Sequence, residues 1–116
     1  MENVRKENLI VNLSLEFAIE IVKYCDILEE GKKFVIARQL LKSGTSIGAN
    51  IREAQNAESR SDFIHKFKIA AKEAEETEYW LLICKSSQSY PAIDHLMERL
   101  KSIQKIINKI IVNSRV

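Results

Sequence analysis

The sequence is poor in the residues that make turns. It contains three glycines and one proline among 116 residues, whereas an all-β chain needs a turn signal about every 8–12 residues. Folds built from many short strands are therefore excluded, and long uninterrupted helices are predicted. A chain of this length fits one domain, so we expect residues 1–116 to form a single one.

The sequence also lacks long apolar runs and paired cysteines. It has no run of about 18 apolar residues that would cross a membrane, and residues 1–7 are charged, without the apolar segment of a secretory signal. Cys25 and Cys84 form no CxxC motif and lie in apolar helical stretches. They are predicted to be reduced thiols packed as small hydrophobic side chains. These features predict a soluble cytoplasmic protein.

Residues suited to catalysis or metal binding are few. His65 and His95 are the only histidines, and Asp62-x-x-His65 is the nearest approach to the Glu-x-x-His motif of di-iron bundles. Neither cysteine has an electropositive motif beside it, and the glycines form no phosphate-binding loop. The glutamates at 73–78 spread around a helix, which is typical of a solvated face. The sequence predicts a protein that is not an enzyme and has no catalytic residues, metal or cofactor.

What the sequence does contain is four segments whose apolar residues recur three or four positions apart. The third and fourth segments carry heptad seams. Short connections force neighbouring helices to run antiparallel. The predicted fold class is all-α, an antiparallel up-down-up-down four-helix bundle. The expected helices span residues 3–29, 34–57, 62–86 and 91–113.

The expected ends of these helices rest on a few residues. Gly31 is predicted to stop the first helix, and Ser59 with Asp62 resembles a capping box before the third. Pro91 suits the first turn of the fourth helix, where its missing N–H costs nothing.

Three of the expected helices, the first, third and fourth, carry more apolar residues than one buried stripe needs. The surplus residues of the fourth are Ile106, Ile111 and Val112. Exposed apolar patches usually mark association surfaces, so self-association is predicted; the alternative is that helix crossings bury these residues. The predicted oligomer interface is Val11, Leu15, Ile19, Val22, Tyr79, Trp80 and Ile83.

The second expected helix has two unusual features. Gly44 and Gly48 each cost about 1 kcal/mol against alanine in a helix interior, which indicates close approach of a neighbouring helix or room for a partner chain. A flanking polar strip is either a solvated face or a hydrogen-bonded interface, in which Asn50 would fix the register. The strip consists of Ser43, Ser46, Asn50 and Glu53.

The charge pattern is most suggestive near the C-terminus. The net charge is only +2, but residues 99–116 contain no acid, and three lysines recur there four residues apart on one helical face. Such a stripe either contacts phosphates or is a solvated face whose cations suit a helix C-terminus. The predicted phosphate contacts are Arg38, Arg99, Lys101, Lys105 and Lys109.

Residues 39–81 also carry a recognisable pattern. It includes the run Lys42-Ser43-Gly44-Thr45-Ser46-Ile47-Gly48-Ala49-Asn50-Ile51-Arg52-Glu53-Ala54, the segment Ser59-Arg60-Ser61-Asp62-Phe63-Ile64-His65-Lys66, and Ala71-Lys72-Glu73-Ala74-Glu75-Glu76-Thr77-Glu78-Tyr79-Trp80-Leu81. This pattern resembles the bacterial four-helix-bundle family encoded within intervening sequences of 23S ribosomal RNA genes, whose members are also called S23 ribosomal proteins. The likeness spans about residues 13–85, and the chain departs from it at Arg52 and Ala54, where relatives often have alanine and glycine.

The resemblance implies an up-down-up-down bundle that assembles into a homopentameric ring. It also implies similarity to the accessory variability determinant proteins of diversity-generating retroelements, which are basic pentamers that contact nucleic acid and a reverse transcriptase. No catalytic residue carries over. We therefore expect a non-enzymatic, homo-oligomeric bundle that binds RNA. The alternative is a protein-interaction scaffold that docks a protein partner through Tyr79, Trp80 and the extra face of the first helix.

Overall fold

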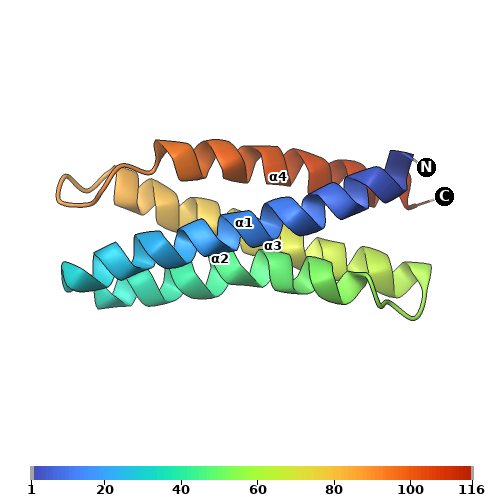
Figure 1. The fold of residues 1–116 in the computed structure, drawn as a ribbon, viewed down its shortest axis with the longest axis horizontal. Helices are drawn as coiled ribbons and strands as arrows, with labels where there is room; N and C mark the ends of the chain where they lie inside the picture. Colours follow the sequence, from blue (N-terminus) through green and yellow to red (C-terminus); the bar gives the residue numbers. More distant parts are fainter. Residues whose placement is uncertain (1, 116) are drawn as a thin grey trace.

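The computed structural model is a bundle of four long helices (Figure 1). It describes the backbone of residues 2–115 and the side chains of residues 9–115. No strand occurs within that part of the chain. The helices are α1 (Glu2–Glu30), α2 (Phe34–Ala54), α3 (Arg60–Lys85) and α4 (Asp94–Asn113).

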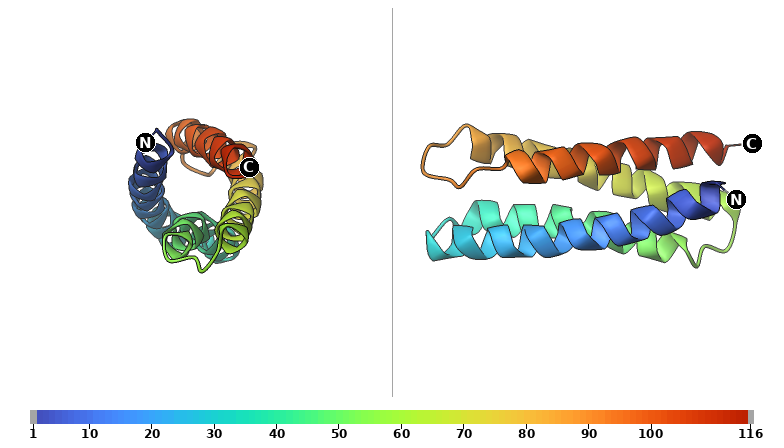
Figure 2. Two further views of the ribbon diagram at one scale, coloured as in Figure 1. Left: turned by 90° about the vertical axis from the view of Figure 1, so that its right-hand side faces the viewer. Right: turned by 45° about the horizontal axis from the view of Figure 1, so that its top comes forward.

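The helices lie along the long axis of a particle measuring 47 × 22 × 19 Å. Successive helices run in opposite directions and are joined at alternate ends, and the view along the axis shows them surrounding a common core (Figure 2). α1 and α3 each pack against both α2 and α4, whereas the backbones of the diagonal pairs, α1 with α3 and α2 with α4, lie farther apart over the described residues. The predicted all-α four-helix bundle is confirmed. None of the helices, over the residues that the structure describes, is long and apolar enough to span a bilayer.

The core consists of the seams that the spacing predicted. Each fully buried Phe, Leu or Ile stabilises the fold by about 1.5–3 kcal/mol, and all four helices contribute to one cluster. The largest fully buried side chains are Phe17, Phe67, Ile10, Ile21, Leu28, Leu40, Ile47, Ile51, Leu81, Leu100, Ile103 and Ile107.

The end of α1 differs from the prediction in one residue. Gly31 does not adopt the left-handed conformation; Lys32 does, with φ of 64°. The Lys33 N–H donates to the Leu28 carbonyl (2.8 Å) and the Lys32 N–H to the Glu29 carbonyl (2.9 Å), which is the hydrogen-bond pattern of a Schellman motif. The helix therefore stops one residue later than expected, with a lysine where glycine would be less strained.

The connection between α2 and α3 begins earlier in the chain than predicted. α2 ends at Ala54 rather than at residue 57, because the N–H groups of Gln55 and Ala57 donate to carbonyls three residues earlier instead of the four of an α-helix. The predicted cap of α3 is confirmed: the Asp62 N–H donates to Ser59 Oγ (3.0 Å). Asp62 Oδ2 in turn accepts from the Glu58 N–H (3.3 Å). With Ser59 as the capping residue, α3 begins at once with Arg60.

The start of α4 was predicted wrongly. The helix begins at Asp94, not at Pro91. The Pro91 carbonyl accepts a hydrogen bond from the Tyr24 hydroxyl of α1 (2.8 Å), and Ile93 is buried in the core. The segment therefore crosses the end of the bundle before it turns into the helix.

The two glycines of α2 lie at close helix contacts, as predicted. A methyl group at Gly44 would lie 2.9 Å from Cγ2 of Ile21, and one at Gly48 would lie 3.2 Å from the Ser14 carbonyl oxygen. Both neighbours belong to α1. The glycines thus set the separation of α1 and α2.

Candidate interaction surfaces

The outer face of α4 carries the predicted basic stripe, and one of its lysines is engaged. Lys101 Nζ lies 2.8 Å from Glu78 Oε2 of α3, and Gln104 Nε2 donates to the other oxygen of the same carboxylate (3.1 Å). These two hydrogen bonds, the one from Lys101 first, lower the pKa of Glu78. Lys101 is therefore held at the seam between α3 and α4.

Arg99 is engaged on the opposite side of α4. Its Nη1 lies 3.3 Å from Glu20 Oε1 and 3.8 Å from Glu16 Oε2, both on α1. His95 Nε2 lies 3.1 Å from the second oxygen of Glu20. Two of the five predicted phosphate contacts thus already face carboxylates within the protomer.

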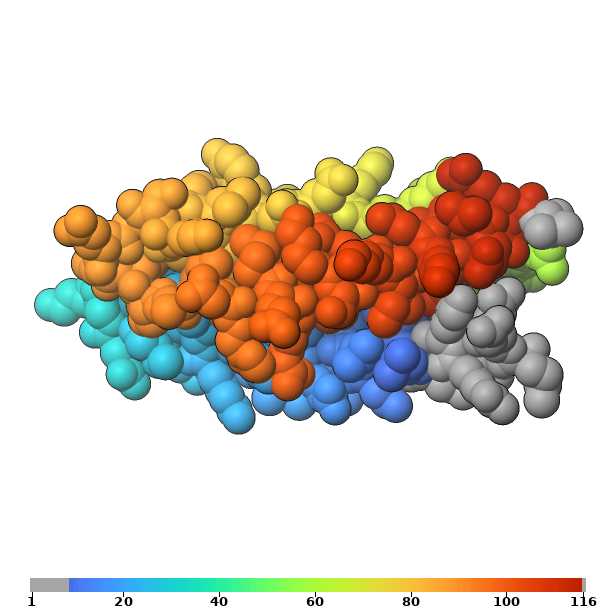
Figure 3. Space-filling model, turned by 90° about the horizontal axis from the view of Figure 1, so that it is seen from above, coloured from blue at the N-terminus to red at the C-terminus, as the bar shows by residue number. Residues whose placement is uncertain are grey.

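Lys105 and Lys109 remain exposed. Among the residues that the structure describes, neither forms an ion pair. Figure 3 views α4 from its outer side, with α3 along one flank and α1 along the other. Lys105 and Lys109 follow Lys101 along this helix toward its C-terminal end.

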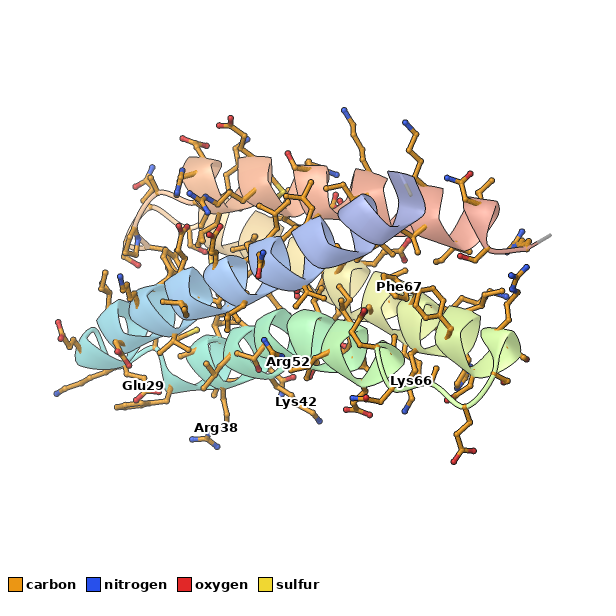
Figure 4. All side chains as sticks on the ribbon, turned by 45° about the vertical axis from the view of Figure 1, so that its right-hand side comes forward. Glu29, Arg38, Lys42, Arg52, Lys66 and Phe67 are labelled. Carbon is orange, nitrogen blue, oxygen red and sulfur yellow. The ribbon has the colours of Figure 1, made fainter. Side chains whose placement is uncertain are left out.

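Arg38 lies elsewhere. It belongs to α2, the helix diagonal to α4, and together with Lys42 it points away from the bundle (Figure 4). The chain from residue 31 to residue 52 contains no acid. The five predicted contacts therefore do not form one patch within a protomer; α2 and α4 carry separate basic faces.

The predicted oligomer interface falls on two different sides of the molecule. On α1, Leu15 and Ile19 are each 47% exposed, Val22 is exposed and Val11 is half-buried. On α3, the helix diagonal to α1, Tyr79 is 59% exposed, while Trp80 and Ile83 are half-buried. The alternative that helix crossings bury these residues fails for the four exposed ones. Ile111, by contrast, belongs to the core.

The apolar face of α1 continues into a groove beside α2. The groove has a volume of about 180 Å³, and it is deep at Gly48 because that residue has no side chain to fill it. Its lining is mainly apolar or small, with Arg52 at one end. The lining residues are Val11, Ser14, Leu15, Ala18, Thr45, Gly48, Ala49 and Arg52.

The exposed face of α3 has a different character. Tyr79 and Trp80 form an edge-to-face aromatic pair with ring centroids 5.2 Å apart. The indole Nε1 of Trp80 donates to Glu76 Oε2 (3.2 Å). Residues 73–84 contain four glutamates and no basic residue. This face is aromatic and acidic, whereas the groove across α1 and α2 is lined mainly by aliphatic and small residues, with Arg52 as its charged member.

The polar strip of α2 is divided between the core and the surface. Ser43 is buried and accepts a hydrogen bond from the Thr77 hydroxyl of α3 (3.0 Å). Ser46 and Asn50 instead bond to carbonyls of their own helix, and Glu53 pairs with Lys66 of α3 (3.1 Å). The strip therefore joins α2 to α3 within the protomer at two points.

The cysteines are buried thiols beside Tyr24. Burial, followed by the neighbouring Cys84, raises the pKa of Cys25 to about 12, and burial raises that of Cys84. Such thiols are poor nucleophiles. Over the described side chains, no three His, Cys, Asp or Glu residues gather where they could hold a metal ion.

Comparison with known proteins shows the family. Residues 6–109 match the model of the 23S rRNA-intervening sequence proteins. The chain belongs to this family. A crystal structure of a protein of unknown function from the S23 ribosomal protein family of Bacteroides thetaiotaomicron VPI-5482 is 45% identical to this chain, with a TM-score of 0.87. That similarity covers 92% of this chain and 98% of the other. Comparison with curated proteins gives no match.

One group of side chains was not singled out from the sequence of this intervening-sequence protein. His65 and Lys68 of α3 border the same hollow as Arg115. Residues 63–72 contain no acid, which is a sequence signal for a basic face, although α3 as a whole is rich in glutamate. Only the antiparallel packing of α3 on α4 brings this segment beside the acid-free C-terminal one.

Proposed function

We propose that this member of the 23S rRNA-intervening sequence family is a non-enzymatic, cytoplasmic RNA-binding protein that assembles into a homo-oligomeric ring. The observation that carries the RNA-binding part is the exposed pair Lys105 and Lys109 on an acid-free stretch of α4. Cations of this kind displace condensed counterions from phosphates and bind without sequence preference. The family's link to ribosomal RNA genes makes structured RNA the ligand to test first.

Two exposed apolar faces support the proposed assembly. Because they lie on diagonal helices, one protomer presents its α1 face to the α3 face of the next, which is a heterologous contact. The charges suit this arrangement: Arg52 lines the groove of the aliphatic face, and Glu76 accompanies the aromatic face. Heterologous contacts close into a ring when the rotation between neighbours divides a circle, and the family resemblance favours five copies.

Solution mass tests the assembly. Light scattering coupled to size exclusion should give about five times the protomer mass for the wild type. Ile19→Glu and Tyr79→Glu each remove one of the two faces and should each give monomers. Mixing the two variants should give heterodimers and nothing larger, since only one intact contact can form. Val112→Glu, at an exposed apolar residue of α4, is the matched control and should leave the mass unchanged.

A monomeric wild type would refute the ring. So would a Tyr79→Glu variant that keeps the full mass, because the α3 face would then be free in the assembly.

RNA binding is tested by filter binding at low salt with a structured RNA. The wild type should bind, and the logarithm of its affinity should fall linearly with the logarithm of salt, by about 0.7–0.9 per phosphate neutralised. Lys105→Ala with Lys109→Ala should lower that slope by about 1.5 in total. Absence of binding by the wild type at low salt would refute the RNA-binding proposal.

The rival is a protein-interaction scaffold. The exposed Tyr79 ring beside Trp80 favours it, because aromatic side chains dominate protein interfaces. A Tyr79→Glu variant that keeps the wild-type mass but loses a protein partner after nuclease treatment would favour the scaffold over the ring.

A further inference from the structure

The end of the bundle where α3 begins and α4 ends contains a hollow of about 360 Å³ between the two elements. It is lined by Ser61, Ile64, His65, Lys68 and Arg115. Four of these side chains are exposed, and the half-buried Ile64 belongs to the partly buried layer against the core. The hollow thus has an apolar side and a rim of hydrogen-bond donors.

The charge of this rim is of one sign. Lys68 comes from α3 and Arg115 from the segment after α4, and no carboxylate side chain of residues 9–115 lines the hollow. Among the residues that the structure describes, neither Lys68 nor Arg115 forms an ion pair. The nearest acid in sequence, Asp62, is occupied in capping α3, where its Oδ2 accepts from the Glu58 N–H.

The donors suit a phosphate group. An arginine can bind two phosphate oxygens in parallel, and a lysine supplies a mobile point charge. Ser61 adds a hydroxyl and lies in the first turn of α3, which carries the positive end of the helix dipole. The imidazole of His65 is a further donor at the same rim.

We propose that this hollow is a phosphate-binding site and that, in the RNA complex, it holds one backbone phosphate beyond the reach of Lys105 and Lys109. The role of the hollow in the RNA complex rests on the proposed RNA-binding function, whereas phosphate binding by the hollow does not. The hollow would fix where the nucleic acid ends on the protomer, because it lies at one end of the bundle, where α3 begins and α4 ends.

Nuclear magnetic resonance titration with inorganic phosphate tests the site directly. The backbone amides of Ser61, His65, Lys68 and Arg115 should shift together with a single dissociation constant, and these shifts should vanish in the variant carrying Lys68→Ala and Arg115→Ala. Lys85→Ala, at the far end of α3, removes one positive charge away from the hollow and should leave the shifts intact. Titration with sodium chloride at equal ionic strength separates phosphate binding from general screening.

RNA filter binding forms the second arm. If one phosphate occupies the hollow, the double variant should lower the salt slope by about one unit, not two, and weaken binding equally for all RNA sequences. Absence of phosphate-dependent shifts at these amides would overturn the site. Shifts with phosphate, but an RNA salt slope equal to that of Lys85→Ala, would overturn its role in RNA binding. A wild type that binds phosphate here but no RNA at low salt would refute the proposed function and leave the phosphate site standing.

Discussion

Replacing Gly44 with alanine measures how tightly α1 and α2 are packed. The new methyl group would lie 2.9 Å from Cγ2 and 3.0 Å from Cγ1 of Ile21. Ile21 is fully buried, and its β-branched side chain has little rotamer freedom in a helix. The methyl group therefore cannot be accommodated by a small turn of a flexible side chain, and the two helices must separate slightly.

Two effects of opposite sign decide the outcome. Alanine gains about 1 kcal/mol over glycine in a helix interior, whereas forcing an extra methyl group into a packed core costs about 1–3 kcal/mol. Since both distances are far below ordinary contact, we take the middle of the second range. The expected net loss is about 1 kcal/mol, which lowers the Tm by roughly 4 °C for a chain of this size.

Urea unfolding and thermal unfolding, both followed by circular dichroism, provide the assay. Gly31→Ala is the matched control, because its methyl group would meet nothing closer than 3.5 Å and the backbone there is not left-handed. That variant should be neutral or stabilised by up to about 1 kcal/mol.

A double-mutant cycle isolates the contact. Ile21→Ala alone should cost about 2–5 kcal/mol, and less in the Gly44→Ala background, where the added methyl group fills part of the void. The coupling should be at least about 0.5 kcal/mol. A Gly44→Ala protein as stable as Gly31→Ala, or a cycle with no coupling, would refute the argument.

Three further outcomes follow from single contacts. Lys32→Gly should stabilise the protein by about 0.5–1 kcal/mol in urea unfolding, because it relieves the left-handed lysine after α1; a destabilised variant would contradict this. Because the pKa of Glu78 is lowered in the folded state, the ionised Glu78 stabilises the folded protein above an ordinary pKa of about 4.3, and this contribution is lost as the pH falls through the folded-state pKa. Glu78→Gln should flatten that part of the curve of unfolding free energy against pH. An unchanged curve would count against the Lys101 contact. Cys25, with a pKa of about 12, should react with iodoacetamide at pH 7.5 only after unfolding, and fast labelling of the native protein would show that the thiol is not buried.

The helices were predictable because their signal is local. Spacings such as Phe63, Phe67, Ala70 and Ala74 determine which face of one helix turns inward, and that face is buried in the structure, apart from the half-buried Phe63. The start of α4 was not predictable in this way, since it depends on the Tyr24 hydroxyl reaching the Pro91 carbonyl 67 residues away. The left-handed conformation of Lys32 was not predicted, because glycine is the residue that usually adopts it after a helix. The neighbouring Gly31 was therefore expected to end α1.

The candidate site was less predictable than the fold because its charges depend on partners. Periodicity placed Lys101, Lys105 and Lys109 on one face of a helix, but it carries no information about what lies across the seam. Glu78 is 23 residues from Lys101 in the chain, and Glu20 is farther still from Arg99. Only the packing of α4 between α1 and α3 reveals which cations are already engaged.

These internal ion pairs move the centre of the basic surface along the molecule. A lysine or arginine that faces a carboxylate within the protomer must give up that contact before it can neutralise a phosphate, so Arg99 and Lys101 contribute less to RNA affinity than their charge suggests. Lys105 and Lys109 have no such cost within the described part of the chain. Under the proposed RNA-binding function, the part of the stripe that is free to contact phosphates is therefore its C-terminal half, which continues toward the hollow at Arg115. A scan of single alanine variants along α4 should then show salt slopes that fall more for Lys109→Ala than for Lys101→Ala, and equal effects at both positions would mean that the Glu78 contact does not persist in solution.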